Sequence, residues 1–501
     1  MEIRVVAGDI TGLTADAAVV NLFEGVREPG GATGAMDRAL EGGIRRLIAA
    51  GEVRGKLGEL TVVHTLGHIP PERVVIAGLG KAEEFDLDRV RQVAAEVCRL
   101  LRRLGVRHGA TIVHGAGLAG LDARPAARAL AEGSLLGLYR FRRHQARGEE
   151  DTDLERLTVV EFDRAKLPGI ESGLDQGRIG AEFTCLARDL INEPGNLLTP
   201  GDLAERATQV AEESDLEIEV LQRDELERRG MGALLGVAQG SHQPPCLIVL
   251  RYRGAPGSAQ PTLGLLGKGV TFDAGGISIK PAAGMGAMKG DMAGGAAVIG
   301  ALGALGKLQP AVNVTGIVPA VENLPGGGAY RPGDVLRAMN GKSIEIITTD
   351  AEGRLILADA LCYAKQLGLS PLVDVATLTG NCRQALGSVY SGIFGNDQGL
   401  VERVIRAGQE AGERYWQLPL HPDYKELIRG DYGDIKNSGG GAAGAITAAW
   451  FLAEFAQGTP WAHLDIAGTS TSDRDRGPLV KGATGVALRT LVNLALEMAE
   501  G

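Results

Sequence analysis

Two carboxylates and a guanidinium stand within five residues of one another, in the segment Asp350-Ala351-Glu352-Gly353-Arg354. The apolar residues 344–347 before them predict a buried strand, and residues 355–361 after them predict a helix. In an extended segment, residues two apart project to the same side, so we expect Asp350 and Glu352 to face one site. Such a group suits a metal or an anion. The alternative is a plain helix start, in which the acids complement the helix dipole and Arg354 pairs with one of them.

A second group of charged residues follows the predicted strand 263–266. Lys268, Asp273 and Lys280 lie there among glycines, and Asp291 stands just before a predicted helix. Ligands of α/β sheets bind beyond the carboxyl ends of strands, so these residues are candidates for a site. The alternatives are an N-cap role for Asp291 and solvated lysines. A phosphate-binding loop is a further alternative, but the GxxxxGK[ST] spacing is absent.

Four carboxylates gathered at one site would repel one another unless cations compensate them. The four candidates are Asp273, Asp291, Asp350 and Glu352. Two divalent cations would balance their charge, activate water and clamp the reacting oxygens. Oxygen-rich ligation without histidine suits Mg²⁺ or Mn²⁺ as readily as Zn²⁺. Lys280 and Arg354 would then stabilise an oxyanion.

Strand and helix patterns alternate along the whole chain, which predicts an α/β protein. The first part has a mixed sheet, with strands predicted over residues 3–6, 17–22, 60–66, 73–78, 111–114 and 157–162 and helices over 35–50 and 87–104. In the second part, helix-separated strands predict a mainly parallel central sheet covered by helices. Its strands are predicted over 216–221, 246–252, 263–266, 312–318, 343–347, 372–376 and 462–466, and its helices over 177–191, 200–213, 224–229, 293–305, 353–366 and 484–498. The charged, irregular stretch 141–170 places the domain boundary near 165–175, which gives domains 1–170 and 171–501.

The composition bounds the class of protein. The chain has 501 residues, of which 44% are hydrophobic and 23% charged, so it is globular rather than disordered. A net charge of -10 disfavours nucleic acid or an anionic membrane as the main partner. Five cysteines without a CxxC pair favour a reducing compartment. The sequence shows no signal-peptide core at its start and no apolar run of membrane-spanning length, so we expect a cytoplasmic protein.

The charged segments 267–280, 291–296 and 349–355 resemble the signature segments of the leucyl aminopeptidase (cytosol aminopeptidase) family. The resemblance continues through 192–200, 329–334, 374–380, 434–437, 445–449 and 461–468, so it covers roughly residues 180 to 501. It implies a catalytic domain of the zinc-exopeptidase type behind an N-terminal macrodomain-like α/β domain. It also implies a metal-dependent aminopeptidase that releases N-terminal amino acids from peptides.

The resemblance implies a role for each charged residue of the site. Asp273 and Glu352 resemble the carboxylates shared by two metals, Asp350 the ligand of one metal, and Lys268 and Asp291 the ligands that complete the other. The two dications (Zn or Mn, with Mg also open) would depress the pKa of Lys268, because an amine binds a metal only when it is neutral. Asp291 and its metal would hold the substrate's α-amine. A metal-bridged water would attack the scissile carbonyl.

Two basic groups and four pocket residues complete the implied site. Lys280 would polarise the scissile carbonyl, and Arg354 would hold a bicarbonate ion as general base. The resemblance places Met288, Thr377, Leu378 and Gly380 around the substrate, with a preference for Leu-like or Met-like first residues; without it, Met288 would be read as core. Thr348 stands where the family usually has Asn, at a position that the resemblance places close to the pocket, so it bears on the side-chain preference. Ala293 stands where the family usually has Gly, and neither change removes a ligand. The family also implies peptide substrates with a free N-terminus and a homohexamer of two stacked trimers.

Two further functions remain open. Some bacterial proteins that this chain resembles also bind DNA, which the acidic balance of the chain disfavours. Residues 8–11, 15–21 and 30–36 resemble the macrodomain pattern that holds ADP-ribose. However, Leu22-Phe23-Glu24-Gly25 replaces the usual asparagine-rich continuation, so these residues could equally be a shared scaffold.

Overall fold

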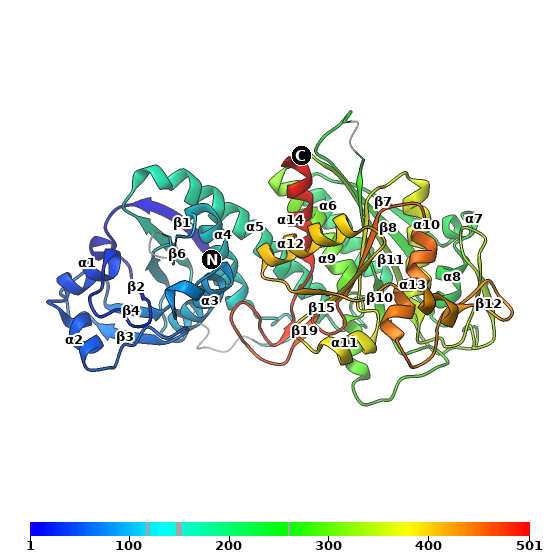
Figure 1. Cartoon of the computed structure of the whole chain (residues 1–501), viewed down its shortest axis with the longest axis horizontal. Helices are drawn as coiled ribbons and strands as arrows, with labels where there is room; N and C mark the ends of the chain where they lie inside the picture. Colours follow the sequence, from blue (N-terminus) through cyan, green and yellow to red (C-terminus); the bar gives the residue numbers. More distant parts are fainter. Residues whose placement is uncertain (117–119, 147–152, 259–260, 501) are drawn as a thin grey trace. The chain divides into compact units, whose positions relative to one another are not determined.

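The computed structural model describes residues 1–501 except 117–119, 147–152, 259–260 and 501 (Figure 1). The chain forms two compact units. The N-terminal unit comprises Met1–Glu182 with Asp473–Lys481, and the C-terminal unit comprises Phe183–Ser472 with Gly482–Gly501. Helix α5 (Leu167–Asn192) contains both the boundary expected from the sequence, at residue 170, and the division between the two units.

A six-stranded sheet in the order β1-β6-β5-β2-β4-β3 forms the centre of the N-terminal unit. Its neighbours are parallel except for the antiparallel pair β3 and β4, so the sheet is mixed, as predicted. The strands are β1 (Glu2–Ala7), β2 (Ala17–Leu22), β3 (Leu60–His64), β4 (Arg73–Gly78), β5 (His108–Thr111) and β6 (Arg156–Glu161). The longer helices are α1 (Gly31–Ala39), α2 (Gly43–Ala49), α3 (Leu87–Arg103) and α4 (Ala123–Leu138).

Two predictions for the N-terminal unit were wrong, and one helix was not predicted. The single helix expected over residues 35–50 is two helices, because Glu41 and Gly42 have φ angles of 53° and 77° between them. The strand expected over 111–114 lies at 108–111 instead. Helix α4 was missed, because its alanine-rich sequence has no sharp polar face; it is largely buried.

The C-terminal unit is built on a mainly parallel sheet in the order β16-β15-β18-β14-β9-β11-β8-β7, with β10 paired to β11. Its antiparallel pairs are β15 with β18, β11 with β8, and β8 with β7. The strands are β7 (Glu217–Gln222), β8 (Cys246–Arg253), β9 (Leu263–Gly267), β10 (Gly269–Asp273), β11 (Asn313–Asn323), β14 (Leu372–Ala376), β15 (Ser391–Gly395), β16 (Tyr415–Gln417) and β18 (Trp461–Asp465). The predicted fold class is therefore confirmed. Strand β10 was not foreseen, since its glycines suggested only a loop.

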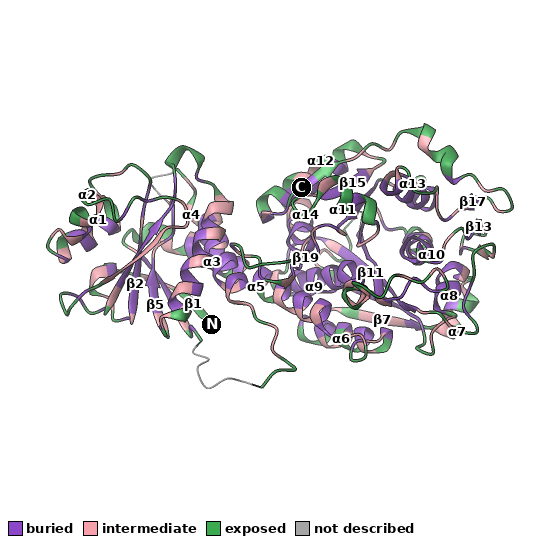
Figure 2. Cartoon of the chain, turned by 90° about the horizontal axis from the view of Figure 1, so that it is seen from below, coloured by how far each residue is buried: buried purple, intermediate pink, exposed green. Residues whose placement is uncertain are grey.

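Small elements and helices surround this sheet. Strands β12 (Val335–Arg337), β13 (Ser343–Glu345) and β17 (Ile435–Lys436) form one small sheet, and β19 (Thr471–Ser472) pairs with β20 (Gly482–Ala483). The helices are α6 (Pro200–Glu213), α7 (Arg223–Arg228), α8 (Gly232–Ala238), α9 (Ala293–Leu308), α10 (Glu352–Gln366), α11 (Gly380–Leu386), α12 (Gln398–Ala411), α13 (Gly444–Ala456) and α14 (Leu488–Glu500). Figure 2 shows that the strands and inner helix faces of each unit are buried.

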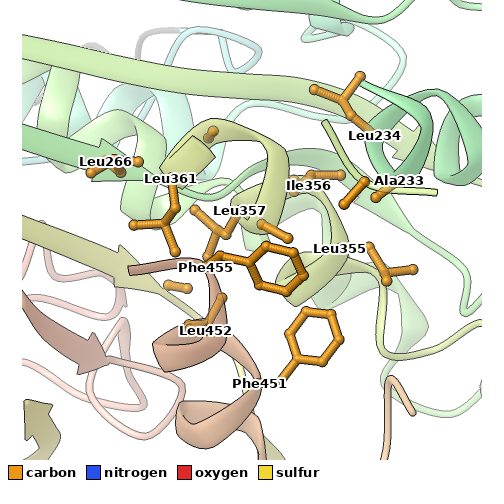
Figure 3. Close-up of a cluster of buried hydrophobic side chains, with 14 of the residues drawn as sticks. Ala233, Leu234, Leu266, Leu355, Ile356, Leu357, Leu361, Phe451, Leu452 and Phe455 are labelled. Atoms are coloured by element: carbon orange, nitrogen blue, oxygen red, sulfur yellow. The ribbon is translucent and has the colours of Figure 1, made fainter. Parts of the chain in front are cut away.

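Helix α10 is packed tightly in the core of the C-terminal unit. Leu355 and Leu357 of α10 belong to one buried cluster with Phe451 and Phe455 of α13 (Figure 3). Burying one such side chain stabilises a fold by about 1.5–3 kcal/mol. The carboxylate of Asp359, farther along α10, accepts the backbone N–H groups of Leu234 and Met339 at 2.9 and 2.8 Å. This packing fixes the start of α10, where the charged segment of the sequence lies.

One helical stretch, Met285–Leu308, is long and apolar enough to cross a membrane by length and composition alone. In this fold, 89% of its apolar window is buried within the protein. It is therefore the kind of apolar helix found in a protein core.

Candidate active site

The candidate residues gather where neighbouring parallel strands end. Lys268 follows β9 directly, Asp273 is the last residue of β10, and Thr377 follows β14. Asp291 directly follows the 3₁₀ segment η4 (Met285–Gly290), and Glu352 begins α10. Since β9, β14, β11 and β10 pair in parallel, their carboxyl ends meet at one edge of the sheet. Strand β13 ends at Glu345, so the approach to Asp350 is a loop and not the predicted strand over 343–347.

Lys268 lies at the centre of the first half of the cluster. Its Nζ is 2.7 Å from Asp291 Oδ2, 2.8 Å from Glu352 Oε1 and 3.2 Å from the carbonyl oxygen of Thr377. A Cβ on Gly353 would lie 2.6 Å from Lys268 Cε, so only glycine leaves room for the lysine there. The side chain is 3% exposed, which rules out the solvated alternative for Lys268.

Lys280 joins the other half of the cluster. Its Nζ lies 2.8 Å from Asp273 Oδ2 and also contacts Asp350 Oδ1. One ligand-type atom from each of Asp273, Asp350 and Glu352 lies within 4.8 Å of the other two. The four predicted carboxylates and both lysines therefore form one continuous charged cluster.

The charges of the cluster shift one another's pKa values. Burial and the neighbouring Glu352 raise the pKa of Asp273 to about 6. Burial likewise holds the pKa of Asp291 well above its ordinary value. For Lys268, burial alone would lower the pKa, but Asp291 and Glu352 outweigh it and raise the pKa. The carboxylates thus hold a cation firmly and repel one another, which is the electrostatic setting that suits divalent cations.

Two of the plainer alternatives fail on geometry. Met292, not Asp291, is the N-cap of α9, and Asp291 Oδ1 accepts a 2.7 Å hydrogen bond from Thr377 Oγ1. Arg354 donates from Nη1 to the carbonyl oxygen of Asn437 at 2.7 Å, and among the described residues it forms no ion pair. Its buried Nε has no hydrogen-bond partner among those residues, and burial lowers the pKa of Arg354 to about 10. Arg354 is thus a buried cation available to an anion.

A cavity of about 340 Å³ opens onto the cluster. Its lining contains every site residue predicted from the sequence: Lys268, Asp273, Lys280, Met288, Asp291, Asp350, Glu352, Arg354, Thr377, Leu378 and Gly380. Met288 is half-buried beside this cavity, so the core alternative for it was wrong. Thr348 does not line the cavity; its Oγ1 accepts the N–H of Asp350 at 3.2 Å.

Sequence reasoning missed several residues of the site. Thr379, Arg383, Ala467, Ser470 and Thr471 also line the cavity. Arg383 could have been found, because it follows Gly380 by three residues on one helix and so shares its face. Asn323 could not, because nothing in its local sequence connects the end of β11 with residues 273, 349 and 352.

Carboxylates and lysines gathered at the ends of parallel strands in an α/β fold are the kind of site that metal-dependent hydrolases use. Comparison with known families then identifies the family of this chain. The model of the cytosol aminopeptidase family, catalytic domain, matches residues 185–492, and the model of its N-terminal domain matches residues 19–147. The chain belongs to the cytosol aminopeptidase family and is a peptidase.

Individual relatives are similar to this chain over nearly the whole length of both sequences. A protein named "Probable cytosol aminopeptidase" from Alkaliphilus metalliredigens is 46% identical, over 99% of this chain and 100% of its own. One of the same name from Solibacter usitatus is 48% identical over 99% of each chain. Among solved structures, the bottromycin maturation enzyme BotP matches with a TM-score of 0.85 and 34% identity, over 97% of this chain and 100% of its own. BotP has also been solved in complex with Mn.

Proposed function

We propose that this chain is a two-metal aminopeptidase that releases Leu-like or Met-like N-terminal residues from peptides. The observation that carries the proposal is the joining of four carboxylates, two lysines and a buried arginine around one cavity. Its family membership supports metal-dependent aminopeptidase activity in general. The side-chain preference, the ligand set and the mechanism are the parts we propose.

The donor set fits two divalent cations. Asp273 and Glu352 would be shared between them, Asp350 would complete one site, and Lys268 with Asp291 would complete the other. Carboxylate oxygens suit Mn²⁺, Mg²⁺ and Zn²⁺, and we favour Zn or Mn. When bound, the cations would supply Lewis acidity and an activated water. They would also lower the pKa of Lys268, opposite to the effect of the protein's own carboxylates.

Each remaining polar group then has a task. Asp291 accepts from Thr377 Oγ1 through Oδ1, which leaves Oδ2 beside Lys268. Held in this way, the carboxylate would bind the substrate's α-amine. Lys280 would donate to the scissile carbonyl oxygen as negative charge develops on it. Arg354, with its buried Nε unpartnered, would hold bicarbonate, which would accept the proton of the attacking water.

The apolar part of the cavity supports the choice of substrate. Met288, Leu378 and Gly380 offer an adaptable thioether, an aliphatic side chain and open space beside the cluster. An unbranched or γ-branched apolar side chain would suit this lining. Because Thr348 caps the N–H of Asp350 and does not line the cavity, we propose that its effect on the preference is indirect.

We also propose that the protein is cytoplasmic and assembles as a homohexamer, as its family implies. A sedimentation mass close to that of one chain would contradict the hexamer.

The function is tested by add-back of metals. Protein stripped by a chelator would be assayed on the p-nitroanilides of Leu, Met, Glu and Lys with Zn²⁺, Mn²⁺ or Mg²⁺ restored. We expect no hydrolysis before add-back, and afterwards faster release from Leu and Met than from Glu and Lys. A folded protein that stays inactive with every metal would overturn the proposal.

A further inference from the structure

A fully buried amide, that of Asn323, joins the separate parts of the charged cluster. Asn323 is the last residue of β11 and lies directly beside Asp273 in the β10–β11 register. Its Nδ2 lies 2.8 Å from Asp273 Oδ1, 2.9 Å from the carbonyl oxygen of Thr349 and 3.4 Å from Glu352 Oε2. One side chain thus contacts both carboxylates proposed to be shared and the loop that carries Asp350.

The direction of this amide is fixed by charge and by space. If it were turned over, its oxygen would face three other acceptors, so Nδ2 must point at the cluster. Its Oδ1, on the opposite side, is buried and has no hydrogen-bond partner in the described chain. A Cβ on Gly276, where φ is +64°, would lie 2.8 Å from that oxygen, so only glycine leaves room for it. The amide therefore has one orientation available.

Because Asn323 contacts one oxygen of each carboxylate, the two oxygens of that carboxylate have different partners. Asp273 Oδ1 accepts from Asn323 and from the N–H of Gly275 at 2.8 Å, which leaves Oδ2 turned toward Lys280. Glu352 contacts Asn323 through Oε2 and Lys268 through Oε1. The Thr349 carbonyl oxygen also accepts from Tyr330 Oη at 2.8 Å, so the peptide before Asp350 is held from two sides.

We propose that Asn323 is a positioning residue that orients Asp273, Glu352 and the Thr349–Asp350 segment for metal binding; this rests on the proposed function. Partners outside the ligand set that hold ligands in place typically contribute ten- to a hundredfold to metal affinity. The amide of Asn323 is also neutral, which matters beside so many carboxylates. An amide donates to the carboxylates without adding to the four negative charges already present.

The test measures metal binding directly. Asn323→Leu keeps the branched shape and removes the donor, and Asn323→Ser keeps a shorter donor. We expect Mn²⁺ affinity, measured by calorimetry on chelator-treated protein, to fall about ten- to a hundredfold in the Leu variant and less in the Ser variant. With leucine p-nitroanilide at saturating Mn²⁺, kcat should fall more than KM rises.

The matched control is Asn313→Ala at the other end of β11, where the side chain bonds the backbone of Ala255 and not the cluster. It should bind Mn²⁺ as the wild type does. Wild-type affinity in both Asn323 variants would overturn the inference and leave the proposed function standing. A wild-type protein that binds no metal would overturn the proposed function itself. If Asn323→Leu does not fold, the Ser variant decides the question.

A second, independent observation concerns a further basic residue in the lining of the cavity. Arg383 is exposed and lines the cavity, and its guanidinium has neither an ion pair nor a hydrogen bond among the described residues. The acids that line the same cavity are the four of the cluster, and each of them already contacts Lys268 or Lys280. A Cβ on Gly468 would lie 3.4 Å from Arg383 Cα, so the backbone of α11 is held against the segment that carries Ala467.

We infer that Arg383 binds a carboxylate of the substrate, again on the basis of the proposed function. The cavity, at about 340 Å³, is near the lower end of ligand-sized pockets and suits a short peptide. A short peptide offers its α-amine to Asp291 and has a carboxylate at its other end. An acidic side chain after the first residue presents the same chemistry.

Three peptides separate the two sources of the carboxylate: Leu-Gly, Leu-Gly-amide and Leu-Asp-amide. If Arg383 binds the terminal carboxylate, Arg383→Gln should raise the KM of Leu-Gly about tenfold. If it binds an acidic side chain, the same change should raise the KM of Leu-Asp-amide instead. A tenfold change is roughly the effect of one charge-assisted contact. Leu-Gly-amide and leucine p-nitroanilide should be unaffected. The control, Gln384→Ala, alters the next residue of α11, which does not line the cavity. Equal KM changes for all substrates, or none, would overturn the inference, whereas inactivity of the wild type on leucine p-nitroanilide would count against the proposed function.

Discussion

Lys268 and Glu352 meet inside the C-terminal unit, with Nζ 2.8 Å from Oε1 and the two side chains 3% and 2% exposed. Lys268 approaches from the end of β9 and Glu352 from the start of α10. Because Asp291 contacts the same Nζ, the lysine compensates two buried carboxylates at once. This one ammonium group ties together three segments that are far apart in the sequence.

Replacing that ammonium should destabilise the protein when chelator keeps metals away. Lys268→Met leaves two buried carboxylates without their cation, and breaking a buried pair costs about 3–5 kcal/mol. Urea unfolding in the presence of chelator would measure the loss. The control is Lys436→Met, which breaks the more exposed pair with Asp431 and should cost no more than about 1 kcal/mol. Equal effects of the two changes would show that Lys268 compensates nothing.

Lys280→Gln should separate binding from catalysis. If Lys280 stabilises charge on the scissile oxygen, its loss should lower kcat about a hundred- to a thousandfold. KM should change little, because the contact strengthens only as negative charge develops. Steady-state kinetics with leucine p-nitroanilide, together with metal analysis, would check this. A rise in KM with unchanged kcat would instead assign Lys280 to substrate binding.

Bicarbonate should stimulate the enzyme through Arg354. In buffers freed of carbon dioxide, added bicarbonate should raise the wild-type rate, whereas Arg354→Met should be slow and insensitive to it. The buried guanidinium, with an unpartnered Nε, is the physical reason. The decisive measurement is the rate as a function of bicarbonate concentration for both proteins. Equal stimulation of the variant would exclude Arg354 as the anion holder.

Acid should weaken the N-terminal unit through His114, which is buried beside Asn21 with 3.2 Å between Nδ1 and Nδ2. Burial lowers the pKa of His114 to about 4 from an ordinary value of 6.5. Between these values the unfolded chain takes up a proton that the folded chain excludes. The stability that neutral His114 contributes is therefore fully present above pH 6.5. It is lost as the pH falls toward 4, by up to about 1.4 kcal/mol per pH unit.

His114→Gln should remove that part of the acid sensitivity. Urea unfolding at pH 7 and pH 5 would measure the unfolding free energy of both proteins. Between pH 7 and pH 5, the wild type should lose more stability than the variant. His64→Gln, at an exposed position, is the control. A difference that does not depend on pH would contradict the assignment to His114.

Much of the site could be predicted because its residues sit at recognisable places in the sequence. Asp273 ends a strand, Glu352 begins a helix, and Asp291 lies just before the N-cap of another helix; parallel strands bring such points together. The carboxylates converge although the loop before Asp350 is not the expected strand, because the start of α10 fixes the position of Glu352.

The rest depended on tertiary contacts that leave no local pattern. Asn323 ends an ordinary buried strand, and only the β10–β11 register places it beside Asp273. The break between α1 and α2 depends on Glu41 adopting a positive φ, which its residue type does not favour. Helix α4 is buried among neighbours, so its sequence lacks the polar stripe that identifies a surface helix.

The most direct test of the account is the metal content of Glu352→Ala. Glu352 contacts Lys268 and Asn323 and is proposed to be shared by both cations, so its loss should affect both metal sites at once. Equilibrium dialysis against Mn²⁺ or Zn²⁺ should give two ions per wild-type chain and a strong loss of binding in the folded variant, together with loss of leucine p-nitroanilide hydrolysis. Two ions retained per chain in Glu352→Ala would contradict the two-metal site described above.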